Sequence, residues 1–190
     1  YMRGRMNATR SYAEPVPIGG LMEAGTVSRV IASKDDQFSE GDIVVSRTGW
    51  QDYAAVPGTQ LRKVDPALAP ISTAIGVLGM PGMTAYTGLL NIGKPQPGET
   101  VVVAAASGAV GSVVGQIAKI KGCKVVGLAG SQKKCTYVME ELGFNACINH
   151  RASDVAQQLT DACSDGIDVY FENVGGVVWE AVFPLLNMFS

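Results

Sequence analysis

The chain has 190 residues, of which 47% are hydrophobic and 17% are charged, and its formal net charge is -2. Such hydrophobicity excludes an intrinsically disordered chain. The lack of a basic surplus argues against a nucleic-acid partner, and no apolar run approaches the ~18 residues of a membrane span. The four cysteines form no CxxC pair, so we expect reduced thiols in a cytoplasmic protein.

Residues 1–78 contain short apolar runs separated by glycine and proline, a texture typical of a small β-rich unit. We expect four short strands here, at residues 24–32, 42–46, 53–56 and 61–64. The sequence starts at Tyr1 instead of Met and stops at Ser190 in mid-pattern. We therefore expect a piece of a longer chain.

From residue 79 onward, predicted strands and helices alternate at short spacing. A helical segment at residues 84–90 precedes strands at 101–105, 124–128, 146–149 and 167–172, which alternate with helices at 110–121, 133–142, 154–163 and 177–186. This order predicts an α/β protein with a doubly wound parallel sheet, the Rossmann arrangement. Because a parallel strand should follow the last helix, we expect one more strand beyond the sequence.

Two of the predicted helices carry more local signals. In the helix at 110–121, the spacing places Val113, Val114, Ile117 and Ile120 on one apolar face. In the helix at 154–163, Ser153 is a candidate N-terminal cap.

The segment after the first parallel strand carries a glycine pattern, Ala-x-x-Gly-x-x-Gly, over Ala105, Gly108 and Gly111. Gly108 allows a tight turn close to a ligand, and Gly111 allows the helix to pack against the strand. The N–H groups at a helix N-terminus favour an anion. With Ala109 and Val110, this loop predicts a pyrophosphate site, and the alternative is a merely tight strand-to-helix turn.

The second strand indicates which dinucleotide is bound. NAD sites usually carry an acidic residue about 20 positions after the glycine loop. Counting from Gly111 leads instead to Ser131, which Lys133 and Lys134 follow closely. A cation attracts a 2′-phosphate that a carboxylate would repel, so the sequence favours NADP(H). The alternative is that both lysines are ordinary solvated charges.

Three segments resemble one protein family. Residues 76–86 (GVLGMPGMTAY), 105–111 and 172–176 (ENVGG) resemble the zinc-independent medium-chain dehydrogenases/reductases. The most similar branch holds the leukotriene B4 12-hydroxydehydrogenase/prostaglandin reductases, plant alkenal double-bond reductases and bacterial NADPH-dependent curcumin reductases. Residues 1–6 (YMRGRM) and 49–53 (GWQDY) are similar to the curcumin reductases in particular. The resemblance extends over essentially the whole chain, and full family members are longer.

The resemblance implies a partial GroES-like catalytic domain at residues 1–78 and a C-terminally truncated Rossmann domain at 79–190. It also implies metal-free, NADPH-dependent reduction of the C=C bond of α,β-unsaturated ketones and aldehydes by a homodimer. A quinone oxidoreductase of the same superfamily and an inactive nucleotide-binding fragment are the alternatives. One histidine and four cysteines spaced by 12, 12 and 16 residues do not supply the zinc ligands of alcohol dehydrogenases.

The resemblance also assigns cofactor residues. It implies that the loop Gly108, Ala109, Val110 and Gly111 holds the pyrophosphate and that Lys134 contacts the 2′-phosphate. His150 stands where many family members have a phosphate-contacting tyrosine, so this side chain either donates to the phosphate or is an exposed polar residue at a strand end. Asn173 is placed near the nicotinamide, with a role as a turn former as its alternative.

A tyrosine is the expected catalytic residue. Tyr1 matches the family's Pro-Tyr-Met motif, and a phenol can donate to the enolate oxygen that develops when hydride adds to an enone. For Tyr53 and Tyr86 we expect core or interface positions.

Overall fold

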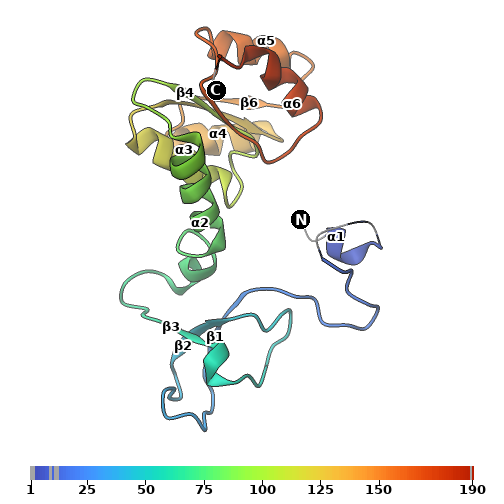
Figure 1. Ribbon diagram of the computed structural model, residues 1–190, viewed down its shortest axis with the longest axis vertical. Coiled ribbons are helices and arrows are strands. Elements are labelled where there is room, and N and C mark those ends of the chain that lie inside the picture. Colours follow the sequence, from blue (N-terminus) through green and yellow to red (C-terminus); the bar gives the residue numbers. More distant parts are fainter. Residues whose placement is uncertain (1–2, 9, 11–12, 189) are drawn as a thin grey trace. The chain divides into compact units, whose positions relative to one another are not determined.

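The computed structural model describes residues 3–8, 10, 13–188 and 190 (Figure 1). The chain forms two compact units, residues 1–75 and residues 76–190. Among the described residues, no helix is both long enough and apolar enough to cross a membrane.

The first unit contains a small antiparallel sheet with strand order β1-β2-β3. Its elements are α1 (Arg3–Met6), β1 (Thr26–Arg29), β2 (Ile43–Ser46), η1 (Gly58–Gln60), β3 (Arg62–Val64) and η2 (Ile71–Ile75). The predicted strands at residues 24–32, 42–46 and 61–64 are confirmed as shorter strands. The prediction for residues 53–56 is wrong, because this segment is irregular and runs into Pro57, which cannot donate to a strand ladder.

The second unit contains a four-stranded sheet in the order β6-β5-β4-β7, and every pairing in it is parallel. The strands are β4 (Thr100–Val103), β5 (Lys124–Ala129), β6 (Ala146–Asn149) and β7 (Val169–Phe171). The first strand in sequence, β4, lies between β5 and β7, so the strand order reverses at this point. The predicted doubly wound α/β sheet is therefore confirmed.

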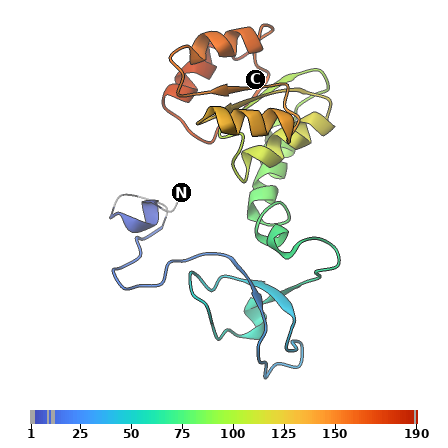
Figure 2. The same cartoon turned by 180° about the vertical axis from the view of Figure 1, so that it is seen from behind.

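Helices cover both faces of this parallel sheet (Figure 2). The segments α2 (Met80–Tyr86), α3 (Gly111–Ile120) and α4 (Gln132–Glu140) pack on one face, together with the π-helix η3 (Thr87–Gly93) that continues α2. The segments α5 (Val155–Ala162) and α6 (Val177–Val182) pack on the other face, and η4 (Phe183–Leu185) follows α6. Strands buried on both faces are expected to be apolar throughout, as Val101 to Val103 are.

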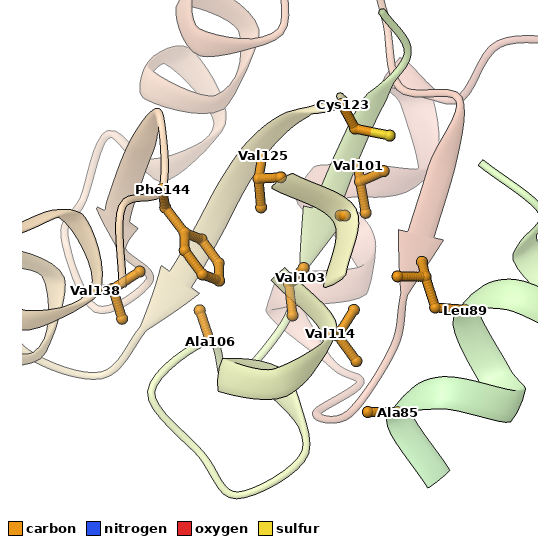
Figure 3. Packing of buried hydrophobic residues seen from close by; sticks show 11 residues of the cluster. Ala85, Leu89, Val101, Val103, Ala106, Val114, Cys123, Val125, Val138 and Phe144 are labelled. Atoms are coloured by element: carbon orange, nitrogen blue, oxygen red, sulfur yellow. The ribbon is translucent and has the colours of Figure 1, made fainter. Parts of the chain in front are cut away.

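The predicted apolar face of α3 is wrong at one position. Ile120 does not belong to the buried face of α3, because its side chain is 83% exposed. The buried positions are Gly111, Val114, Gly115 and Ala118, one helical stripe of mostly small residues. A Cβ at Gly115 would lie 1.8 Å from Cζ of Phe144, so the glycine makes room for that ring, which Figure 3 shows among the buried valines.

One smaller prediction about a side chain also fails, and another is narrowed. The N-cap residue of α5 is Asp154, with no side-chain capping bond, so Ser153 does not cap this helix. Tyr53 and Tyr86 are 76% and 53% exposed, so neither belongs to the core of its own unit. An interface position for these two tyrosines stays a prediction.

The chain returns to the sheet after α6. Ile167 N–H donates to Leu185 O, and Asn187 N–H donates to Ile167 O, both at 2.9 Å. This forms a parallel bridge between Ile167 and Leu186. Asp168 N–H donates instead to Thr100 O, so the new pairing lies on the opposite edge of β7 from β4. The helix predicted at residues 177–186 therefore ends earlier, at Val182, and the chain already pairs with the sheet at Leu186. The strand expected beyond the sequence stays a prediction.

Candidate dinucleotide-binding site

The loop between β4 and α3 has a geometry that only small residues allow. Ala105 has a φ of 49°, a left-handed conformation unusual for a residue with a side chain. Gly108 N–H donates to Ala105 O at 2.8 Å, which closes a tight turn. A Cβ at Gly111 would lie 2.4 Å from Ala105 O, and one at Gly108 would lie 3.0 Å from it. Glycine at position 111 therefore permits the close approach of α3 to the end of β4.

The same loop presents backbone donors. In the part of the chain that the structure describes, the N–H groups of Ala109, Val110 and Gly111 have no hydrogen-bond acceptor. Val110 is the N-cap of α3 and makes no side-chain capping bond. Unpaired N–H groups and the positive end of the helix dipole favour an anion here. The loop therefore fits a pyrophosphate, as the glycine pattern predicts.

A second element reaches this loop from across the sheet. Asn173 follows β7, and its Nδ2 donates to Ala104 O at 3.0 Å, at the end of β4. In open α/β sheets the ligand crevice lies outside the carboxyl ends of the strands, where the strand order reverses. The Gly108–Gly111 loop and Asn173 are therefore brought together at the expected place, with Asn173 on the β7 side.

The residues after β7 are organised by one carboxylate. Glu172 accepts hydrogen bonds from the N–H groups of Val174 and Gly175 and, at 2.8 Å, from the hydroxyl of Tyr170. Burial raises the pKa of Glu172, but these hydrogen bonds outweigh burial and hold it below its ordinary value. For Tyr170, burial and the neighbouring carboxylate raise the pKa of the phenol. Glu172 is thus ionised at neutral pH and Tyr170 is a neutral donor.

A second part of the candidate site lies at the carboxyl ends of β5 and β6. Ser131 is the N-cap of α4, and its side chain accepts from Lys134 N–H at 3.4 Å. A Cβ at Gly130 would lie 3.3 Å from Nε2 of His150 and 3.7 Å from Nε of Arg151. Both side chains therefore converge on Gly130, directly before the helix that carries Lys134.

This cluster contains basic groups without acidic partners. Within the described ranges, neither Lys134 nor Arg151 forms an ion pair. Arg151 is missing from the residues that the sequence predicts for the site, although its position directly after a strand that ends in Asn149-His150 was an available signal. Cations that form no ion pair suit a phosphate better than a ribose hydroxyl.

Two further predictions about the site concern its chemistry. Tyr1, the expected catalytic residue, lies outside the described residues. Over those that are described, no three or more His, Cys, Asp or Glu side chains are grouped so that they could hold a metal ion. All four cysteines are free thiols, and burial raises the pKa of Cys163 to about 11.

Several known proteins are similar to this chain. It is 56% identical over 187 residues to the NADPH-dependent curcumin reductase of Escherichia coli (strain K12), covering 98% of this chain and 54% of that enzyme. It is 45% identical over 191 residues to a 2-alkenal reductase (NADP(+)-dependent) of Nicotiana tabacum, covering 99% and 55%. The crystal structure of CurA in complex with NADPH from Vibrio vulnificus matches with a TM-score of 0.93 and 54% identity, over 100% of this chain and 56% of that one. The chain thus spans about half the length of these relatives.

The strand order and the glycine loop define a Rossmann-type α/β unit, the class of fold that binds dinucleotides at the carboxyl ends of its strands. Residues 1–64 match the family described as the N-terminal domain of oxidoreductase, and residues 109–188 match the zinc-binding dehydrogenase family. The chain belongs to the medium-chain dehydrogenases/reductases.

Proposed function

We propose that this chain is the central part of an NADPH-dependent reductase that acts on the C=C bond of α,β-unsaturated ketones and aldehydes. The observation that carries the proposal is the cluster at the end of β5 and β6. There the side chains of His150 and Arg151 converge on Gly130, which is followed by Ser131, the N-cap of the helix that carries Lys134. The similarity to enzymes named curcumin reductase and 2-alkenal reductase supports the substrate class.

Each half of the crevice has its own task in this proposal. The unpaired N–H groups of Ala109, Val110 and Gly111 bind the pyrophosphate. Lys134, His150 and Arg151 contact the 2′-phosphate of the adenosine half. Asn173 borders the nicotinamide, because the two mononucleotide halves of this fold lie on opposite sides of the strand reversal. When bound, NADPH supplies the hydride that adds to the β-carbon of the enone.

The proton for the reaction comes from the protein or from water. Hydride addition to the β-carbon leaves negative charge on the carbonyl oxygen, and the phenol of Tyr1 donates a hydrogen bond to this oxygen in our proposal. Residues 1–78 then form part of the catalytic domain, and residues 79–190 form the nucleotide-binding domain. We further propose a homodimer in the cytoplasm, with a small unsaturated carbonyl compound as substrate.

The phosphate assignment is tested by replacing Lys134 with alanine and titrating the protein with NADPH and with NADH. Loss of a charge-assisted hydrogen bond weakens NADPH binding about tenfold or more. NADH lacks the 2′-phosphate, so its affinity stays within about twofold of the wild-type value. Lys121→Ala is the matched control, because this exposed lysine at the C-terminal end of α3 has no part in the proposed site. Equal losses for NADPH and NADH contradict the assignment.

The substrate class is tested by turnover. The wild-type protein is assayed with NADPH and either an α,β-unsaturated aldehyde or a quinone. The proposal expects oxidation of NADPH with the enal and formation of the saturated aldehyde. Turnover of the quinone alone assigns the chain to the quinone oxidoreductases instead, and binding of NADPH without turnover of either compound leaves a nucleotide-binding module.

A further inference from the structure

We propose that Glu172 is a positioning residue, which holds the loop of residues 173–175 in place at the nicotinamide end of the crevice. This inference rests on the proposed function, because it assigns a task within the same cofactor site. Among the described residues, the Glu172 side chain accepts hydrogen bonds from Tyr170, Val174 and Gly175. None of these belongs to the pyrophosphate loop or to the cluster at Gly130, so Glu172 acts through Asn173.

The loop after β7 has a backbone with much conformational freedom. Gly175 and Gly176 both have positive φ values, 75° and 57°, and residues 172–176 lie outside the helices and strands. Such a segment has many accessible backbone conformations. Oε1 of Glu172 accepts the N–H groups of Val174 and Gly175, which fixes the two residues that follow Asn173.

The second carboxylate oxygen is attached to the sheet. Oε2 of Glu172 accepts the hydroxyl of Tyr170 at 2.8 Å, and Tyr170 belongs to β7. The Tyr170 ring packs against Trp179 of α6, with ring centroids 6.0 Å apart. One carboxylate therefore joins a flexible loop to a strand whose tyrosine is itself held by a neighbouring helix.

Asn173 connects the loop that Glu172 holds to the cofactor site. This residue lies between Glu172 and the two N–H groups that Glu172 binds, and its side chain is bonded to Ala104 at the end of β4. The next residue, Ala105, begins the pyrophosphate loop with its left-handed backbone. A displaced loop would therefore disturb the nicotinamide side of the crevice and leave the residues at the ends of β5 and β6 unchanged.

The experiment compares two ligands on the purified protein, NADPH and 2′,5′-ADP, which contains only the adenosine half with its 2′-phosphate. In Glu172→Gln, the neutral amide accepts hydrogen bonds more weakly and offers one acceptor oxygen instead of two. We expect NADPH affinity to fall about tenfold while 2′,5′-ADP binds as in the wild type. The rate of hydride transfer at saturating NADPH falls as well.

Two variants complete the test. Glu180→Gln is the matched control, an exposed glutamate in the first turn of α6, and it changes neither affinity. Tyr170→Phe removes a single hydrogen bond from the same carboxylate and shifts NADPH affinity in the same direction by less. If Glu172→Gln does not fold, Tyr170→Phe alone tests the inference.

The outcomes separate the two proposals. Equal weakening of NADPH and 2′,5′-ADP in Glu172→Gln shows a merely structural role and overturns this inference, as does an unchanged NADPH affinity. If the wild-type protein binds neither ligand, the proposed function is wrong and the inference is lost with it. Selective loss of NADPH affinity in both variants supports the inference.

Discussion

The two units differ in how completely their sheets are covered. In residues 76–190, Val101, Val102 and Val103 of β4 are fully buried because helices pack on both faces of the sheet. In residues 1–75, Ile43 and Val44 of β2 are buried. No residue of the two strands beside it, β1 and β3, is fully buried.

This difference bears on where a precise site can be built. Side chains and loops hold fixed positions when the elements that carry them are packed on all sides. The loops after β4 and β7 leave a sheet that is buried on both faces, so the candidate crevice has a rigid support. We therefore expect stability and amide protection to concentrate in residues 76–190.

The largest expected effect is on the free energy of unfolding, when a core side chain of the second unit is removed. Leu128 of β5 is fully buried, whereas Leu68 of the first unit is 82% exposed. Leu128→Ala removes packed methyl groups and leaves a cavity, so the free energy of unfolding of the variant should be lower than that of the wild type by about 2–5 kcal/mol. Leu68→Ala should change it by less than about 0.5 kcal/mol. Urea denaturation measures both, and similar losses in the two variants would contradict the comparison.

A smaller loss of stability is expected when one methyl group is added at the pyrophosphate loop. In Gly111→Ala the new Cβ meets backbone atoms of Ala105 and Ala106, which cannot move aside as a side chain can. Alanine favours a helix by about 1 kcal/mol over glycine, yet we expect a net destabilisation of about 1–3 kcal/mol from the overpacking.

The control for this variant comes from the first unit. A Cβ at Gly25 would have Ser46 O, at 4.0 Å, as its nearest neighbour, so Gly25→Ala should leave thermal unfolding nearly unchanged. NADPH titration of Gly111→Ala adds a second readout, because displacement of α3 moves the unpaired N–H groups. A Gly111→Ala protein as stable as the wild type would show that the loop can relax.

Much of the second unit could be predicted because its local patterns and its packing agree. A strand buried on both faces is apolar throughout, so Val101 to Val103 identify β4 without knowledge of its neighbours. The face of α3 could not be predicted in this way. The ring of Phe144 occupies the space beside Gly115, so small residues face the core and Ile120 faces outward.

In the candidate site, too, the local features could be predicted from the sequence and the long-range contacts could not. The glycine loop is contained in seven consecutive residues, and its tight turn is local. The contact between Asn173 and Ala104 joins residues 69 positions apart, and Arg151 reaches Gly130 only because β5 and β6 pair. Such neighbours follow from the strand order, which single-residue patterns do not specify. The roles assigned to these residues stay predictions until ligand binding is measured.

A gain in stability is expected where the pyrophosphate loop is strained. Ala105 has a φ of 49°, and this conformation costs about 1–2 kcal/mol for a residue with a Cβ. Glycine removes the strain but loses more backbone entropy on folding, so Ala105→Gly should stabilise the protein by about 0.5–1 kcal/mol. Lys94, with a φ of 48° at the end of η3, gives the comparison. Lys94→Gly should show a similar gain in melting temperature, whereas a loss in Ala105→Gly would mean that its methyl group contributes to packing.

The smallest effect concerns an ion pair in the first unit. Asp42 Oδ2 lies 2.7 Å from Nζ of Lys63, and the bond from Lys63, followed by the one from Ser39 N–H, holds the pKa of Asp42 below its ordinary value. A carboxyl group with a lowered pKa in the folded state stabilises the fold above its unfolded-state pKa. That contribution is lost as the pH falls through the folded-state pKa.

Asp42→Asn should therefore be slightly less stable than the wild type at neutral pH and equally stable in acid. Because Lys63 is exposed and Asp42 is only partly buried, added salt should also reduce the difference. Urea denaturation at both pH values measures this, and a difference that persists in acid would show that Asp42 acts through its uncharged hydrogen bonds and not through its charge.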